Sequence, residues 1–314
     1  MPFDFAQITS PFRMQPGLRR VAPGQAQLTA SRPNGRHLRE KMAVLATTAD
    51  ESLVAVPGFD PAPALSVIAF EASLAALPAF EFEGPGDCAA PHLGWRLRDG
   101  QPQGEGEAAI GDLLAALPAA KRATALLCLA FEEDFAIIDG VTAKIPWLAV
   151  CLPSRWAPEE KVGRHFAQVH APVADNALLI EAGERLARLV TGTDRWERFV
   201  WTISADPRLH QHPGRGKVEW SGDADAEMIA AQASFRHEHQ TFIPVPDTGQ
   251  AVFTIRIGSE RLDDALRSRD DATRLHDALA SMSANVLAYR GLEAVRERLL
   301  DALRTRIATL PAAA

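Results

Sequence analysis

The chain has little cysteine: three residues in 314, with no C-x-x-C spacing. This argues against zinc and iron–sulfur sites, and Cys128 and Cys151 lie in apolar runs typical of reduced, buried thiols. A Gly-rich dinucleotide fingerprint is also lacking, so a redox reaction would need electrons from another protein. The sequence has neither a secretory leader nor a run of eighteen apolar residues, and we expect a cytoplasmic protein without a membrane partner.

Positive charge is scarce as well. The 33 Lys and Arg against 40 Asp and Glu give a net charge of -7 and a pI near 5.7, and no basic run is present. Duplex nucleic acid requires a basic face that neutralises phosphates, so we expect no nucleic-acid partner. The length and the 47% hydrophobic content predict a globular protein with a sizeable core.

The pattern of the first sixty or so residues predicts an N-terminal arm, meaning an extended segment that wraps around the rest of the protein. Extended Pro-containing stretches at 11–21 and 54–63 flank a short amphipathic helix at 37–46. A second helix is expected at 65–77, and the Gly- and Pro-rich stretch 83–107 is expected to be a surface excursion.

From residue 125 onwards the pattern indicates hairpins and helices. Continuous apolarity at 125–131 is typical of a buried strand, and Pro158 opens a helix predicted to run towards His170. The other expected elements are strands at 134–138, 145–152, 199–204, 234–243 and 251–257, a helix at 175–190, and helices after 261. Hairpins interrupted by helices, without βαβ alternation, predict an α+β fold with a mainly antiparallel sheet. We divide it into an N-terminal region 1–124, a core 125–260 and C-terminal helices 261–314.

Two groups of residues are candidates for chemistry. His165 and His170 are imidazoles on one predicted helix, about 140° apart, so they should not bind one metal ion together. Strand alternation puts Arg236, Glu238 and Gln240 on one face, where burial would be costly without partners. From the residues alone, His170 could instead be structural and Arg236 and Glu238 a solvated pair.

The opposite face of the same strand would carry His237, His239 and Thr241. The two histidines permit a zinc site, but the sequence suggests no third ligand.

Four motifs support a more specific interpretation. Residues 132–173 contain a match to an E-D-x-x-x-L hairpin, an F-P-S-x-W-x-P-x-E-K-x-G turn and an I-H-x-P-V stretch. Residues 235–257 match an R-x-E-R-Q-T-L…L-P-x-T-G-x-x-x-F-T-I-R block. In order and spacing these motifs resemble the haem-dependent oxidative N-demethylase family. The resemblance implies a PAS-like curved antiparallel sheet with covering helices, which enclose haem b.

The resemblance also implies roles for residues. His170 would be the axial ligand of the haem iron, with His165 as runner-up, and Glu238 would bind an amine beside Arg236 and Gln240. The remaining candidates for cofactor binding are Arg256, Trp201, Arg198, Lys161 and Arg164. A solvated helix face explains Lys161 and Arg164 equally well, and a core position explains Trp201.

The implied reaction is a monooxygenation that removes a methyl group from a small methylated amine as formaldehyde. Dioxygen is the co-substrate, and electrons would come from a separate NAD(P)H-linked flavin and iron–sulfur reductase. Val200, His239 and Pro244 depart from the family pattern, which leaves two alternatives: a haem sensor or carrier without catalysis, and a haem-free partner subunit.

Overall fold

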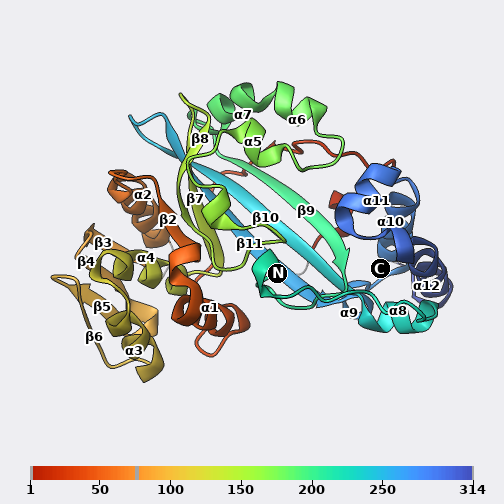
Figure 1. The fold of residues 1–314 in the computed structure, drawn as a ribbon, viewed down its shortest axis with the longest axis horizontal. Coiled ribbons are helices and arrows are strands. Elements are labelled where there is room, and N and C mark those ends of the chain that lie inside the picture. Colours follow the sequence, from red (N-terminus) through yellow and green to blue (C-terminus); the bar gives the residue numbers. More distant parts are fainter. Residues whose placement is uncertain (1–2, 75–77, 313–314) are drawn as a thin grey trace.

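Figure 1 shows the computed structural model of the chain, which describes residues 3–74 and 78–312. Long strands form a seven-stranded sheet in the order β1-β9-β10-β11-β7-β8-β2, with every neighbouring pair antiparallel. Helices lie on its faces and at its ends, so the α+β prediction is confirmed. The strands of this sheet are β1 Arg19–Arg20, β2 Leu53–Ala55, β7 Glu133–Asp139, β8 Lys144–Ala149, β9 Trp196–Ser204, β10 Ser234–Val245 and β11 Gln250–Arg261.

Two predicted hairpins organise the sheet. β10 and β11 pair over their whole length, from Ser234 opposite Arg261 to Val245 opposite Gln250. Asp247 and Gly249 in their turn have positive φ angles of 60° and 67°, which explains the glycine. β7 and β8 form the second hairpin, with the turn between Asp139 and Lys144.

The prediction of a strand at 125–131 was wrong. These residues belong largely to helix α4 (Ala119–Ala130), whose last eight residues are all buried. An unbroken apolar run lacks the periodicity that separates a helix from a strand, so it could not distinguish a helix buried on all sides from a buried strand.

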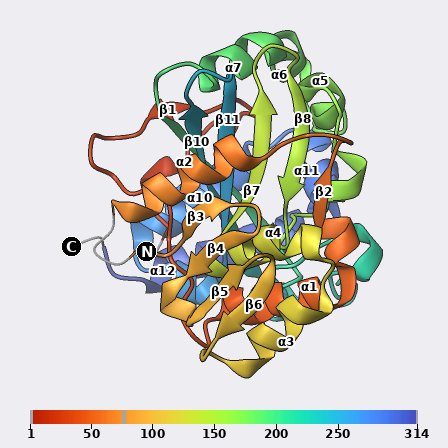
Figure 2. The same cartoon turned by 90° about the vertical axis from the view of Figure 1, so that its left-hand side faces the viewer.

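The expected surface excursion at 83–107 is instead mostly a second sheet. Strands β3 Glu81–Gly84, β4 Asp87–Ala90, β5 Trp95–Arg98 and β6 Gln101–Gly104 form an antiparallel meander, seen in the foreground of Figure 2. Its glycines serve close approach rather than mobility, because a Cβ on Gly104 or Gly106 would collide with the backbone of residues 93–94.

The single helix expected from Pro158 to His170 is two short elements. The 3-10 helix η3 (Pro158–Glu160) ends near Gly163, whose φ of +73° is left-handed, and helix α5 (Phe166–His170) begins afterwards. His165 is the N-cap of α5, with Nδ1 accepting a hydrogen bond from the Ala167 amide at 3.1 Å.

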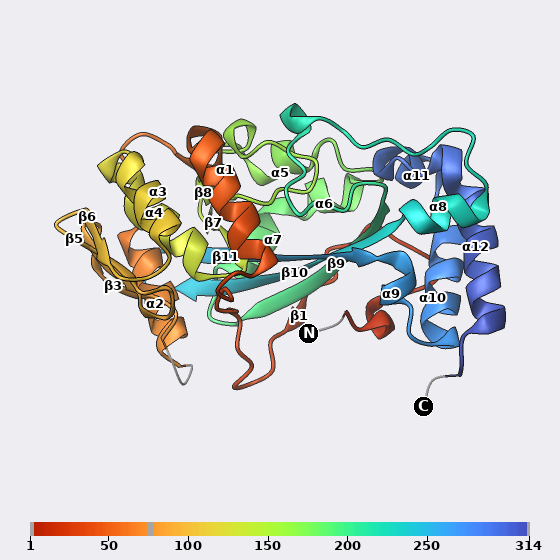
Figure 3. The same cartoon turned by 90° about the horizontal axis from the view of Figure 1, so that it is seen from below.

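The arm, helix α1 (Arg36–Ser52) and helix α2 (Ala62–Ser73) surround one end and one face of the sheet. The expected end of the second helix at Leu77 lies outside the described residues. The remaining N-terminal helices are η1 Phe5–Gln7, η2 Pro91–Leu93 and α3 Ala108–Ala116. Figure 3 shows the sheet nearly edge-on, with α5 and α6 on one side and the N-terminal segment on the other.

Helices α6 (Ala177–Glu181) and α7 (Gly183–Val190) replace the single helix expected at 175–190. The C-terminal part is helical as predicted and packs at the far end of the sheet with α8. These helices are α8 Ala226–Gln232, α9 Leu262–Ala265, α10 Arg269–Ala280, α11 Ala284–Arg290 and α12 Arg296–Thr309, with 3-10 turns η4 Pro213–Arg215 and η5 Glu293–Val295. Among the helices in the described ranges, none is long and apolar enough to cross a membrane.

Candidate functional site

The face of the sheet beneath α5 carries a row of polar side chains on two central strands. Strand register places Arg236, Glu238 and Gln240 of β10 on one face, as alternation predicted. Val200 and Arg198 of β9 lie opposite Glu238 and Gln240 and point to the same side. We call this surface the polar face.

Arg236 is the most deeply buried cation of the polar face, with 1% of its surface exposed. Its Nε donates to Ser154 Oγ at 2.9 Å, and its terminal nitrogens donate to the carbonyls of Arg208 at 3.0 Å and Leu209 at 2.9 Å. Burial lowers the pKa of Arg236 to about 10, so the guanidinium stays charged at neutral pH. Arg236 therefore ties two loops to the sheet.

Glu238 has a donor on each carboxylate oxygen. Ser154 Oγ donates to Oε1, and Gln240 Nε2 donates to Oε2 at 2.5 Å. Glu238 is only half-buried. Since an ionised carboxylate accepts about four hydrogen bonds, lone pairs remain for a ligand.

His170 ends α5 on the same side of the sheet. Its Nδ1 bonds the Phe166 carbonyl at 2.9 Å, and its ring stacks on the Phe166 ring at 4.0 Å between centroids. A carbonyl only accepts, so Nδ1 carries the hydrogen and Nε2 carries the lone pair. Burial, with smaller contributions from the charges of Arg198 and Lys161, lowers the pKa of His170 to about 4. The imidazole is therefore neutral at pH 7 and able to bind a metal through Nε2.

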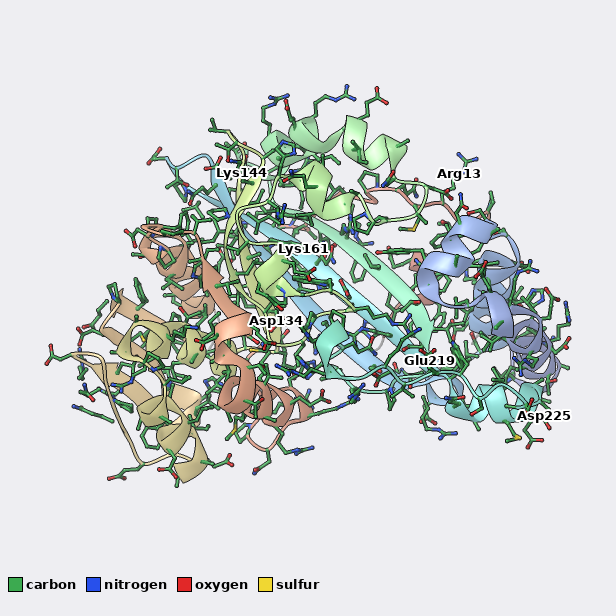
Figure 4. All side chains as sticks on the ribbon, viewed as in Figure 1. Arg13, Asp134, Lys144, Lys161, Glu219 and Asp225 are labelled. Atoms are coloured by element: carbon green, nitrogen blue, oxygen red, sulfur yellow. The ribbon has the colours of Figure 1, made fainter. Side chains whose placement is uncertain are left out.

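Two cations near His170 form no ion pair with any residue that the structure describes. Arg198 Nε is buried without a hydrogen-bond partner, and Arg198 Nη1 makes only a 3.4 Å contact with the Pro16 carbonyl. Lys161 follows η3 and lies over the sheet in Figure 4, and it forms no ion pair among the described residues. Burial lowers the pKa of Arg198, and the charge of Glu238 acts against that shift. Arginine is effectively always protonated, so the buried Nε that lacks an acceptor among the described residues favours an anionic ligand.

Other predicted site residues lie away from this cluster. Arg256 belongs to the opposite face, where its Nη2 is 2.6 Å from Glu132 Oε2. Trp201 is also on that face, 6% exposed, and packs on Phe12. Arg164 is exposed, and His165 uses its Nδ1 to cap α5.

Within the described residues, the structure supplies no third ligand for a zinc site at His237 and His239. His239 Nε2 bonds Glu197 Oε2 at 2.7 Å, whereas His237 Nδ1 is buried and has no hydrogen-bond partner within residues 3–74 and 78–312. In the described part of the chain, the only cluster of three potential metal ligands is Glu51, Glu159 and His212, far from this strand in sequence.

Sequence reasoning missed Ser154, which contacts the polar face, and Tyr289, which lies near it. Ser154 lies inside the F-P-S-x-W motif, but its contact with Glu238 spans 84 residues. Tyr289 of α11 is the only tyrosine in the chain, and this rarity was the one sequence feature that could have pointed to it. Tyr289 is 48% exposed, and none of the hydrogen bonds among the described residues joins it to the polar face. Partial burial is the main cause that raises its pKa, and the charge of Glu238 adds to it.

One side of the α+β fold thus brings together the neutral imidazole of His170, the cations Arg198 and Lys161, and the hydrogen-bonded carboxylate of Glu238. The family model of the haem-dependent oxidative N-demethylase, alpha subunit-like, matches residues 109–300. This is more than half of the chain, and the protein belongs to that family. The matched region includes the polar face, α5 and α11.

Proposed function

We propose that this chain binds haem b through His170 and uses it in the oxidative N-demethylation of a small methylated amine. The observation that carries the proposal is the bond between His170 Nδ1 and the Phe166 carbonyl, which fixes the ring and leaves Nε2 free. Metal-binding histidines commonly have such a bond from the second ring nitrogen. His170 thus has the properties that an axial ligand of haem iron needs.

Arg198 and Lys161 are our candidates for the haem propionates. Arg198 Nε is an orphaned buried donor, and both cations lie close enough to affect the pKa of His170. A propionate carboxylate would pair with them and accept the hydrogen bond that Arg198 Nε lacks. Haem would then lie on the α5 side of the antiparallel sheet, in the PAS-like arrangement that the family resemblance implies.

Bound haem would supply the activation of dioxygen. The overall reaction balances as a tertiary or secondary methylamine, O₂, two electrons and two protons giving the demethylated amine, formaldehyde and water. Glu238 would bind the amine nitrogen, and the neighbouring Val200 and Ile257, which flank it across the sheet, would contact the methyl groups. A separate NAD(P)H-linked reductase with flavin and iron–sulfur centres would supply the electrons.

The test of haem binding is the absorption spectrum and haem content of purified protein, compared with those of the His170→Ala variant. We expect one haem per chain, and loss or gross change of the Soret band in His170→Ala. His165→Ala is the matched control, since it removes an imidazole five residues away that caps α5, and it should retain the haem spectrum. Equal haem content and spectra for wild type and His170→Ala would exclude His170 as the ligand.

Amine-dependent oxygen consumption tests the reaction itself. With a competent reductase, dimethylamine or trimethylamine should raise NAD(P)H oxidation and release formaldehyde in proportion. Stoichiometric haem without any amine-dependent turnover would instead indicate a haem carrier or sensor.

A further inference from the structure

The turn that carries Ser154 is held rigidly above the polar face. The Leu152 amide donates to Asp134 Oδ2 at 2.6 Å, and the Arg155 amide donates to the Gln211 carbonyl at 2.9 Å. Ser154 itself forms an isolated bridge with Gln211. Its side chain thus projects from a turn whose backbone is fixed on both sides.

The hydrogen bonds of Ser154 have only one possible direction. Arg236 Nε can only donate, so Ser154 Oγ accepts from it, and the hydroxyl hydrogen is left for Glu238 Oε1. Gln240 donates to Glu238 Oε2 from the other side. A guanidinium has no acceptor atom, so Arg236 cannot take the hydroxyl hydrogen of Ser154 and the order cannot reverse.

We propose that Ser154 is a positioning residue that, with Gln240, fixes the plane of the Glu238 carboxylate so that its free lone pairs receive the N–H groups of a protonated methylamine. The proposal rests on the proposed function, because it assigns the amine to Glu238. It adds a requirement on the ligand: the ammonium must carry at least one N–H.

A directional acceptor discriminates between ammonium ions of similar charge. Dimethylammonium has two N–H donors and trimethylammonium has one, whereas tetramethylammonium has none. A carboxylate acting only as a charge would bind all three, since Coulomb attraction does not depend on a donor. Binding of tetramethylammonium should therefore be weak and insensitive to Ser154.

The experiment compares haem-loaded wild type with Ser154→Ala and Ser154→Thr. Calorimetric titration with dimethylammonium and tetramethylammonium chloride gives the affinities, and crystal structures of the three ligand-free proteins give the position of Glu238. Thermal unfolding and haem content show whether each variant is folded. Ser154→Thr retains the hydroxyl and serves as the conservative rescue.

We expect Ser154→Ala to bind dimethylammonium roughly tenfold more weakly, the effect of losing one hydrogen bond at a charged group. Ser154→Thr should stay within about threefold of wild type, and the Glu238 carboxylate should rotate only in Ser154→Ala. Unchanged affinity together with an unmoved Glu238 in a folded Ser154→Ala would overturn the proposal. If wild type binds no dimethylammonium, the amine function fails, while the crystal structures still decide whether Ser154 positions Glu238.

Discussion

At the scale of single residues, the polar face depends on a buried guanidinium, Arg236, beside a half-buried carboxylate, Glu238. Arg236 is shielded from solvent, which makes its charge costly to bury. A hydroxyl and several carbonyls accept hydrogen bonds from the guanidinium and offset that cost. Glu238 is nearby and favours the charged guanidinium electrostatically. The two side chains are neighbours on one strand face, and the Ser154 hydroxyl links them by accepting from Arg236 and donating to Glu238.

The Glu238→Gln variant tests the carboxylate without changing its shape. The amide keeps an oxygen for Ser154 but loses the negative charge, so a cationic amine should bind less well by about 1.5–3 kcal/mol. Haem content should be unchanged, because Glu238 is not the proposed ligand. Amine titration followed by the haem absorption spectrum measures the difference, and an amine affinity equal to that of wild type would remove Glu238 from the binding role.

Glu133 is a buried carboxyl group on β7, 2% exposed. Burial raises its pKa to about 7, although the Thr29 amide donates to Oε2 at 2.9 Å. Since the folded state holds this proton more tightly than the unfolded chain, the contribution to stability is present below about pH 4.5 and is lost as pH rises to 7.

The Glu133→Gln variant should remove this pH dependence. Its free energy of unfolding, relative to wild type, should rise by about 1.4 kcal/mol per pH unit between pH 4.5 and 7 and then level off. Urea unfolding at four pH values measures the difference. A relative stability independent of pH would contradict a raised pKa at Glu133.

At the scale of elements, a buried ion pair joins α1 to β7. Lys41 and Asp134 are both fully buried, with Nζ and Oδ1 3.1 Å apart. Lys41 also donates to the Phe131 and Glu133 carbonyls, and Asp134 accepts from the Leu152 amide. This pair therefore fixes the start of β7 and the turn that carries Ser154. Figure 4 labels Asp134 at this junction.

Lys41→Met should be strongly destabilising because it leaves Asp134 as an unpaired buried charge. We expect a loss of about 3–5 kcal/mol in the free energy of unfolding. The double variant Lys41→Met/Asp134→Asn removes both charges and should recover a large part of that loss, since Asn still accepts from Leu152. Urea unfolding of the three proteins checks this, and a double variant less stable than Lys41→Met would show that charge burial is not the cause.

Elements were predictable where the pattern had a period or a turn signal. The β10–β11 hairpin and the shared face of Arg236, Glu238 and Gln240 follow from alternation and from Pro-Asp-Thr-Gly. The α4 run and the β3–β6 sheet were mistaken, because continuous apolarity has no period and glycines at close contacts resemble loop glycines. The partners of Arg236 could not be predicted, since Ser154 is 82 residues away and reaches it only through the turn between β8 and η3.

At the scale of the whole molecule, residues 3–8 cover the face of the sheet opposite the polar face. Phe3, Phe5 and Ile8 belong to the buried cluster that includes Phe235 and helices α10 and α12. Farther along, Arg19 Nε donates to Glu197 Oε1 at 2.8 Å, and β1 pairs with β9. The sheet is thus enclosed by segments from both ends of the chain, an arrangement that local sequence patterns do not encode.

Removal of residues 3–9 should uncover His237 as well as weaken the fold. Phe3 packs on the His237 ring with centroids 5.2 Å apart, and burial is the main reason that the pKa of His237 is lowered to about 4. In the full chain this group adds stability that is complete above about pH 6.5 and is lost as pH falls to 4, because only the unfolded chain takes up the proton in that range.

The shortened chain should lose several kcal/mol of stability from the missing apolar burial, and its His237 pKa should rise towards 6.5. Nuclear magnetic resonance titration of the imidazole in both proteins measures the shift, with His237→Gln assigning the signal. A pKa that stays near 4 without the arm would mean that the sheet and its charges, rather than Phe3 and Phe5, keep His237 neutral.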